Sequence, residues 1–211
     1  MRITKFEHAC FVVDDGNQSI IVDPGSWTTN LEIPGNVAGV VITHEHADHL
    51  DKELLQKIVD KNPDAVVLAH ESVTSTLDGC KAMPVVPNEG VKVGDFELEF
   101  FGGQHATIAE DMPVIANLGV LINGLLYYPG DSFSLPDDRK IEILALPVAA
   151  PWMKYSEAAA FVSSVRPKKI FPTHDAILSQ VGKDLIDSMA GRAAEKVGAE
   201  YQRIDSVSLE A

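Results

Sequence analysis

The chain has 211 residues, of which 45% are hydrophobic and 23% are charged, as in a globular protein that buries one sizeable core. Its 31 acidic and 17 basic side chains give a formal net charge of -14, which repels polyanions, so no nucleic-acid partner is expected. Charged residues interrupt the N-terminal segment, so we expect no signal peptide. Every apolar run is too short to span a bilayer, so we expect no membrane partner. Cys10 and Cys80 make no disulfide framework, so we expect a cytoplasmic protein. The length suits a single domain over residues 1–211.

The first half of the chain consists mainly of predicted strands. Apolar or alternating runs predict strands at residues 3–7, 10–14, 19–22, 40–42 and 65–69. Apolar residues at helical spacing predict a helix over residues 51–61, which Asn62 and Pro63 end, and a short helix is expected at 71–77. Cys10 lies in a strand-like stretch, so we expect a buried thiol there.

The second half of the chain also consists mainly of predicted strands with interspersed helices, but it does not repeat the sequence of the first half. Strands are expected at residues 91–93, 97–101, 116–121, 125–128, 141–146 and 169–171, and the Asn123-Gly124 pair predicts a tight hairpin. Ser156 is expected to cap a helix that runs to Val165, and a helix over 185–197 is stopped by Gly198. Strand-rich halves with covering helices favour an α/β (α+β) fold, a four-layer helix–sheet–sheet–helix sandwich.

Histidines and aspartates follow these apolar strands in short motifs. The segment Thr-His-Glu-His-Ala-Asp-His at residues 43–49 supplies His44, His46, Asp48 and His49. Later strands are followed in the same way by His105, Asp131 and His174. Strand ends gather remote side chains into one crevice, and imidazole and carboxylate are common ligands of divalent metals, so we predict a metal site. Ligands so close in sequence suit two adjacent ions better than one tetrahedral ion, and Asp131 is well placed to bridge them.

Each later motif has an ordinary alternative when it is taken alone. A lone His105 or His174 is more often a surface or hydrogen-bonded histidine, and Asp131 in Pro-Gly-Asp is typical of a turn. Their shared position after strands, together with the dense segment 43–49, favours the metal site.

The segment 44–49, followed in order by His105, Asp131 and His174, resembles the pattern of the metallo-β-lactamase fold superfamily of metal-dependent hydrolases. Residues 7–11 and 20–24 are most similar to a small branch that includes ascorbate-6-phosphate lactonase. The resemblance implies the four-layer αββα sandwich of that superfamily and two divalent ions, with zinc expected first and manganese, iron or nickel as alternatives. It assigns the first ion to His44, His46 and His105. It assigns the second ion to Asp48, His49 and His174. Asp131 would bridge the two.

The same resemblance implies the chemistry of the site. A water shared by the ions would attack the substrate, because coordination lowers the pKa of water toward neutrality. Asp48 is expected to have a catalytic role as well, orienting that water.

Further residues are expected around the ligands. Asp23 matches an aspartate of the family that accepts a hydrogen bond from a ligand imidazole, although a simple turn aspartate is an equal alternative. His8 is expected close to the metals, where it would bind substrate or carry a proton, or else to be a structural histidine between two strands. His70 is expected to be structural.

A pocket is expected beside the metals, formed in part by the loop that contains Trp152, Lys154 and Tyr155. Trp152 and Tyr155 would supply apolar walls, and Lys154 would attract an anionic substrate group or simply be solvated. The loop of residues 106–113 is a second segment with the position to cover the site.

The leading hypothesis is a hydrolase that cleaves an ester-type bond of a small molecule, either a lactone, another acyl bond or a phosphoester. A nuclease or phosphodiesterase is the alternative within the fold, and the acidic charge and lack of a basic arm count against it. An iron-dependent sulfur dioxygenase is a further alternative, whereas a di-iron flavoprotein would carry glutamate where this chain has His46. All seven ligand positions carry suitable residues, which disfavours a binding protein without catalysis. A homo-oligomer is compatible with a hydrolase of this kind, and the sequence does not determine the oligomeric state.

Overall fold

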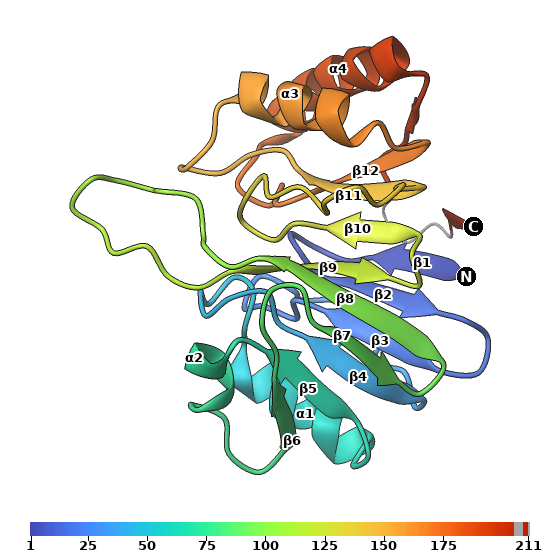
Figure 1. The fold of residues 1–211 in the computed structure, drawn as a ribbon, viewed down its shortest axis with the longest axis vertical. Helices are drawn as coiled ribbons and strands as arrows, with labels where there is room; N and C mark the ends of the chain where they lie inside the picture. The colour runs from blue at the N-terminus through green and yellow to red at the C-terminus, as the bar shows by residue number, and fades with distance from the viewer. Residues whose placement is uncertain (205–208, 211) are drawn as a thin grey trace.

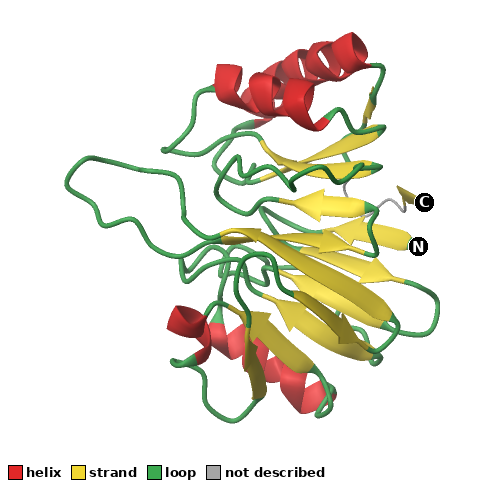
Figure 2. Cartoon of the chain, in the orientation of Figure 1, coloured by secondary structure: helices red, strands yellow, loops and turns green. Residues whose placement is uncertain are grey.

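A computed structural model, which describes residues 1–204 and 209–210, shows two sheets packed face to face with helices on both outer sides (Figures 1 and 2). Each sheet has seven strands, in the orders β14-β1-β2-β3-β4-β5-β6 and β13-β12-β11-β10-β9-β8-β7. Helices α1 and α2 cover the first sheet, and α3 and α4 cover the second (Figure 1). The predicted four-layer sandwich is therefore confirmed.

The first sheet is built almost entirely from the first half of the chain. Its strands are β1 (Arg2–Lys5), β2 (Phe11–Asp14), β3 (Ser19–Val22), β4 (Val37–Val41), β5 (Val66–Ala69), β6 (Lys81–Pro84) and β14 (Leu209–Glu210). Helix α1 (Lys52–Lys61) follows β4, and α2 (Glu71–Thr74) follows β5. Strands β1 to β3 are antiparallel, and β3 to β6 are parallel to one another. The carboxyl ends of these parallel strands therefore lie together at one edge of the sheet.

The second sheet has strands β7 (Gly90–Val93), β8 (Phe96–Gly102), β9 (Leu118–Ile122), β10 (Leu126–Tyr128), β11 (Ile143–Pro147), β12 (Lys169–Thr173) and β13 (Glu200–Tyr201). Its helices are α3 (Tyr155–Val165) and α4 (Gln180–Val197). The predicted hairpin is confirmed, because β9 and β10 pair antiparallel across Asn123 and Gly124. These two residues have φ values of 53° and 65°, the positive values that a two-residue hairpin of this kind needs.

Among the differences from the sequence prediction are two helix starts and one strand that was not expected. Helix α3 starts at Tyr155 rather than after Ser156, because the Glu157 carboxylate accepts a hydrogen bond from the Lys154 backbone N–H at 2.6 Å and so begins the helix earlier. Helix α4 starts at Gln180, five residues before the predicted start, and its exposed first turns carry no apolar pattern. Strand β6 was not predicted because all of its side chains are exposed.

Alternating side chains divide the interior into three layers. Between the sheets, side chains of both inner faces pack together, among them Ile3, Val13, Ile20, Phe96, Phe100 and Phe171. The outer face of the first sheet packs on Leu55 and Ile58 of α1, and this layer contains the buried thiol of Cys10, as predicted. The outer face of the second sheet packs on α3 and α4. With both faces of each sheet covered, the polar side chains of a functional site must come from the strand ends.

Among the described residues, none of the helices combines the length and the apolar character needed to cross a lipid bilayer.

Candidate metal centre

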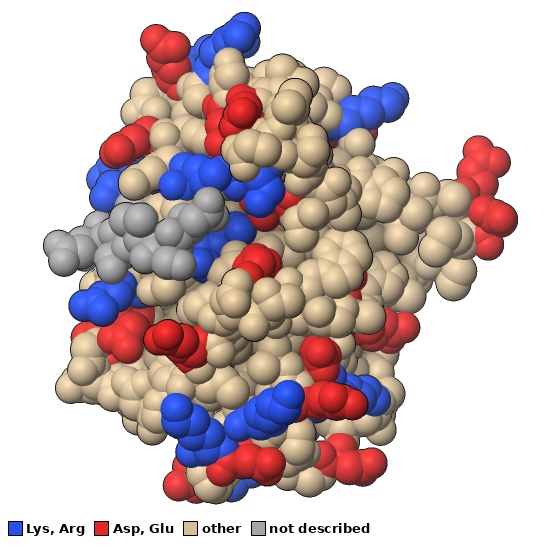
Figure 3. Space-filling model, turned by 180° about the vertical axis from the view of Figure 1, so that it is seen from behind, with Lys and Arg blue, Asp and Glu red and all other residues tan. Residues whose placement is uncertain are grey.

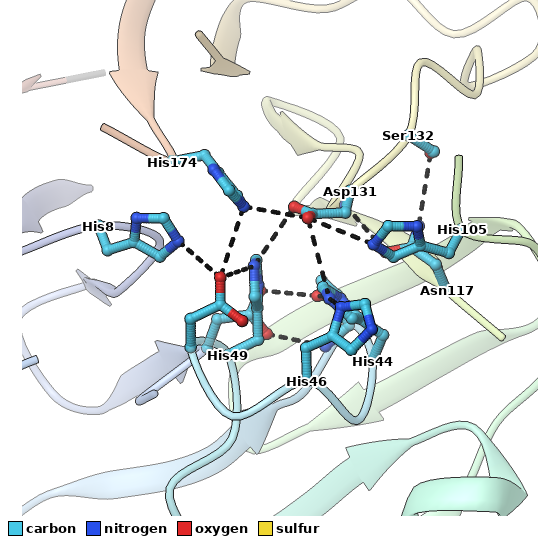
Figure 4. A network of polar contacts seen from close by, with 12 residues as sticks. His8, His44, His46, His49, His105, Asn117, Asp131, Ser132 and His174 are labelled. Atoms are coloured by element: carbon cyan, nitrogen blue, oxygen red, sulfur yellow. Dashed lines mark hydrogen bonds and ion pairs between the residues drawn. The ribbon is translucent and has the colours of Figure 1, made fainter. Parts of the chain in front are cut away.

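Loops at one edge of the two sheets bring together all seven side chains that the sequence predicted as ligands. All of them except Asp48 are labelled in Figure 4. The segment 44–49 follows β4 of the first sheet, whereas the other three residues follow β8, β10 and β12 of the second. Potential ligand atoms within 4.8 Å of one another form two groups. One group is His44, His46, His105 and Asp131, and the other is His8, Asp48, His49 and His174. The site therefore lies at the seam between the two sheets.

Asp131 contacts both groups. Its Oδ2 lies 3.3 Å from His105 Nε2, in the first group. The same oxygen lies 3.0 Å from His174 Nε2, and Oδ1 lies 3.3 Å from His49 Nε2, both in the second group. This is the position required of a carboxylate shared by two adjacent ions.

Asp23 orients two of the histidines from behind. Its carboxylate is fully buried, and Oδ2 accepts a hydrogen bond from His49 Nδ1 at 2.7 Å. The Thr43 hydroxyl donates to the same oxygen at 2.7 Å, and therefore accepts from His44 Nδ1 at 3.0 Å. Both rings are thus fixed with Nε2 toward the centre, which is how buried carboxylates orient metal-binding imidazoles.

Backbone carbonyl groups orient two further histidines in the same way. His105 Nδ1 donates to the carbonyl oxygen of Ala106, and His174 Nδ1 donates to that of Ala149, each at 2.5 Å. Both Nε2 atoms then carry a lone pair that points into the centre.

Several of these buried atoms have no hydrogen-bond partner among the described residues. They are His49 Nε2, His105 Nε2 and Asp131 Oδ1. Buried polar atoms are normally satisfied, and the cost of leaving three so close together would be large. An imidazole and carboxylate donor set of this kind fits divalent ions such as Zn²⁺. The residues present therefore fit the metals that the fold implies.

Electrostatics hold three of the candidate ligands, Asp131, His44 and His46, in the protonation states that metals bind. Burial acts to raise the pKa of Asp131, but the charge of His49 and the contacts with His105 and His174 together outweigh burial, and the pKa lies well below its usual range. Burial is the main cause that lowers the pKa of His44 and of His46. Asp131 is therefore ionised, and His44 and His46 are neutral at pH 7, as coordination requires.

His49 behaves differently because it lies between two carboxylates. Burial acts to lower its pKa, but Asp131 and then Asp23 outweigh burial and raise the pKa well above its ordinary value. The pair of carboxylates therefore stabilises a positive charge at this point of the centre.

His8 lies behind Asp48 and no part of its side chain is exposed. Nδ1 accepts a hydrogen bond from the Ala176 backbone at 3.4 Å, so Nε2 carries the proton that it donates to Asp48 Oδ2 at 3.0 Å. Burial is the main cause that lowers the pKa of His8 to about 4, so the ring is neutral. His8 therefore lies close to the candidate ligands, as expected, and its contact at the centre is with the Asp48 carboxylate. Its role in binding substrate or carrying a proton stays a prediction.

The segment 23–26 fixes the loop that carries the ligands after β4. The Ser26 N–H donates to the carbonyl oxygen of Ala47 at 2.8 Å, and the Asp51 N–H donates to that of Pro24 at 3.0 Å. A Cβ at Gly25 would lie 1.9 Å from the Asp48 carbonyl oxygen, so only glycine allows this approach.

Two partners of Asp131 were missed from the sequence. The buried Asn117 side chain accepts from the Asp131 N–H at 2.9 Å and donates to the Pro129 carbonyl at 2.9 Å, which fixes the turn that carries Asp131. Trp152, expected only as an apolar wall, donates its indole N–H to Asp131 Oδ2 at 2.8 Å. The only sequence signal for Asn117 was a polar residue at the start of a strongly apolar strand.

A cavity of about 490 Å³ opens beside the centre. Its lining includes Trp152 and, from the loop of residues 106–113, Ile108, so both segments expected near the site contribute to it. Lys154 and Tyr155 do not line it. Lys154 instead precedes α3, and His70, the remaining histidine, caps α2 through a bond from the Ser72 N–H to Nδ1.

A model of the β-lactamase superfamily domain matches residues 2–174. The chain belongs to this superfamily. The protein Rv0786c of Mycobacterium tuberculosis is 31% identical over 207 residues, which cover 96% of this chain and 95% of the relative. A protein of Pyrobaculum islandicum named UPF0173 metal-dependent hydrolase is 25% identical over 194 residues, covering 82% of this chain and 84% of its own.

Solved structures of the superfamily share the fold. Igni18, a metallo hydrolase of Ignicoccus hospitalis, superposes with a TM-score of 0.75 at 18% identity, covering all of this chain and 98% of its own. The family resemblance and the metallo-β-lactamase fold inferred from the sequence are therefore confirmed.

Proposed function

We propose that this chain is a metal-dependent hydrolase that uses two divalent ions, zinc in the first place, to cleave an ester-type bond of a small molecule. The observation that carries the proposal is the contact of Asp131 with both donor groups, at 3.0 to 3.3 Å from histidines of each. Relatives such as the Pyrobaculum islandicum protein are named as metal-dependent hydrolases, which supports the same reaction class.

The residues divide the work as follows. His44, His46 and His105 would hold one ion, and Asp48, His49 and His174 the other, with Asp131 shared. The chemistry that two such ions supply when bound is the activation of a water molecule and the polarisation of a carbonyl or phosphoryl oxygen.

Asp48 is the carboxylate best placed to orient a water molecule during the reaction. It lines the cavity, and its side chain is 18% exposed. Burial acts to raise its pKa, but the hydrogen bond from His8 and the neighbouring imidazoles lower the pKa to about 2. The side chain is therefore ionised, and His8 fixes the direction of its carboxylate toward the cavity.

The charge distribution supports a small molecule over a nucleic acid. On the face shown in Figure 3, one cluster of Lys and Arg side chains lies on the left and others lie at the top, upper right and bottom, whereas the loop that projects on the right ends in acidic side chains. That loop, which joins β8 to β9, contributes Ile108 to the cavity. Phosphate backbones are bound by clustered basic residues, whereas this loop of the cavity ends in acidic side chains.

The test combines metal analysis with a substrate screen. Purified protein is expected to contain close to two equivalents of metal and to hydrolyse one class among lactones, thioesters, carboxyl esters and phosphodiesters. The Asp131→Ala variant is expected to lose metal and turnover together, because the shared carboxylate is gone. Asp64→Ala, at a fully exposed aspartate, is the matched control. Unchanged metal content and turnover in Asp131→Ala would refute the shared role of this residue.

A further inference from the structure

The walls of the cavity beside the metal centre are apolar. Apart from residues of the centre itself, every lining residue among the described part of the chain is hydrophobic: Trp27, Ile108, Ala150, Pro151, Trp152 and Ile177. All polar side chains in the lining belong to the centre or, as Trp152 does, donate a hydrogen bond to it. The cavity thus offers polar side-chain contacts only at its metal end.

Two of these wall residues expose large apolar side chains. Trp27 is 42% exposed and Ile177 is 50% exposed, and both line the cavity. The Trp27 ring packs on His8 with centroids 4.5 Å apart. The Trp152 ring lies beside the group that contains His105 and Asp131. Its centroid is 6.2 Å from that of the His105 ring, and its indole N–H donates a hydrogen bond to Asp131. Flat apolar surfaces therefore border both halves of the centre.

No lysine or arginine lines the cavity within the described ranges 1–204 and 209–210. Sites that select anionic substrates usually supply such a cation away from the reacting bond, where it pairs with a carboxylate or phosphate. This chain has a formal net charge of -14, which opposes the approach of anions as well. An anionic group distant from the scissile bond would find no partner in these walls and would lose hydration.

We infer that the substrate carries an uncharged apolar group beside its scissile bond, and that the wall formed by Trp27, Trp152 and Ile177 selects this group over an anionic one. The inference deepens the proposed function and rests on it for the reaction, whereas the binding preference can be measured separately.

Binding is measured with the protein's own fluorescence. Trp27 and Trp152 are the only tryptophans of the chain, so quenching reports occupancy of this cavity. The probes are 2-naphthol and 6-hydroxynaphthalene-2-sulfonate, which differ by one distal anion. The titrations use the full chain as purified and again after chelation of its metal, which removes direct coordination from the comparison. At least tenfold tighter binding of 2-naphthol in both states is expected; equal or tighter binding of the sulfonate would overturn the inference.

A pair of variants locates the preference. Ile177→Lys places a cation in the wall and is expected to reduce or reverse the preference by at least tenfold. Val181→Lys makes the same charge change at a residue that is 78% exposed on α4 and does not line the cavity, so it should leave the preference unchanged. Thermal unfolding confirms that both variants fold. Equal effects of the two substitutions would show that net charge, rather than this wall, sets the preference, and would overturn the inference.

Hydrolysis of the corresponding esters, 2-naphthyl acetate and its 6-sulfonate, separates the two proposals. A kcat/KM at least tenfold higher for the uncharged ester supports both. Cleavage of both esters at the same rate leaves the hydrolase function standing and overturns the inference. Selective binding of 2-naphthol by a protein that hydrolyses none of the screened bonds supports the inference and contradicts the proposed function.

Discussion

Replacement of Asp23 by asparagine tests how the centre is oriented. The carboxylate accepts three hydrogen bonds, from the Thr43 N–H at 2.8 Å, the Thr43 hydroxyl at 2.7 Å and His49 Nδ1 at 2.7 Å. Asp23 has a φ of 45°, and asparagine adopts this left-handed region readily, so Asp23→Asn keeps the backbone and the shape. Only one oxygen then remains, and an amide group replaces the oxygen that faces His49.

The expected loss follows from the tautomer of His49. Facing an amide donor, Nδ1 becomes an acceptor and the proton moves to Nε2, the atom that must offer a lone pair to a metal. Loss of such an orienting partner typically weakens metal binding by about 10- to 100-fold, or about 1.4–2.7 kcal/mol. The free energy of unfolding of metal-free protein should also fall by about 1–3 kcal/mol, because buried hydrogen bonds to an ionised carboxylate are lost.

The assay is competition with a chromophoric zinc chelator, together with urea unfolding of metal-free protein. Asp64→Asn, at an aspartate whose side chain is fully exposed, is the control and should match the wild type in both measurements. An Asp23→Asn protein that binds zinc within twofold of the wild type would show that the ring of His49 is oriented by something else.

Removal of metal with a strong chelator should lower the Tm, and added zinc should restore it in a concentration-dependent way, because an ion that binds only the folded state stabilises it; a Tm indifferent to zinc would contradict this. Asp175→Asn should lower the free energy of unfolding in urea by about 3–5 kcal/mol at pH 7, since the Lys5 ammonium, 3.1 Å away with 1% of its side chain exposed, loses its partner. Burial acts to raise the pKa of Asp175, but Lys5 and the other cations lower it, so this contribution is present above about pH 4 and is lost as the pH falls through the folded-state pKa; the difference between wild type and variant should shrink below pH 4. Gly25→Ala should displace the loop of Asp48 and reduce metal content, whereas Gly191→Ala, where a Cβ meets nothing within 4 Å, should not.

The sequence predicted those parts of the protein that depend on local signals. The hairpin at Asn123-Gly124 and the strands that precede His105 and His174 follow from residue type and alternation within a few positions. The ligand residues could be predicted for the same reason, because each follows an apolar strand and strand ends of a layered fold meet at an edge.

What could not be predicted depends on packing between distant parts of the chain. The burial of His8 results from Ala176 and Trp27 closing over it, and nothing near residue 8 indicates those neighbours. The bond from Trp152 to Asp131 depends on how the loop after β11 folds back, so the sequence suggested an apolar wall only. Helix α4 was predicted too short because exposed residues such as Val181 provide no periodic pattern.

The position of the centre between the sheets has a consequence for how the two halves of the chain are joined. Ligand groups precede residue 50 on one sheet and follow residue 104 on the other, so an ion shared by His49 and His174 would close a loop of roughly 125 residues. Such a closure acts on the unfolded chain as a covalent cross-link does, by reducing the conformations available to it. The ions would then act as reversible cross-links between the two sheets, and metal supply would affect the stability of the fold as well as the chemistry of the site.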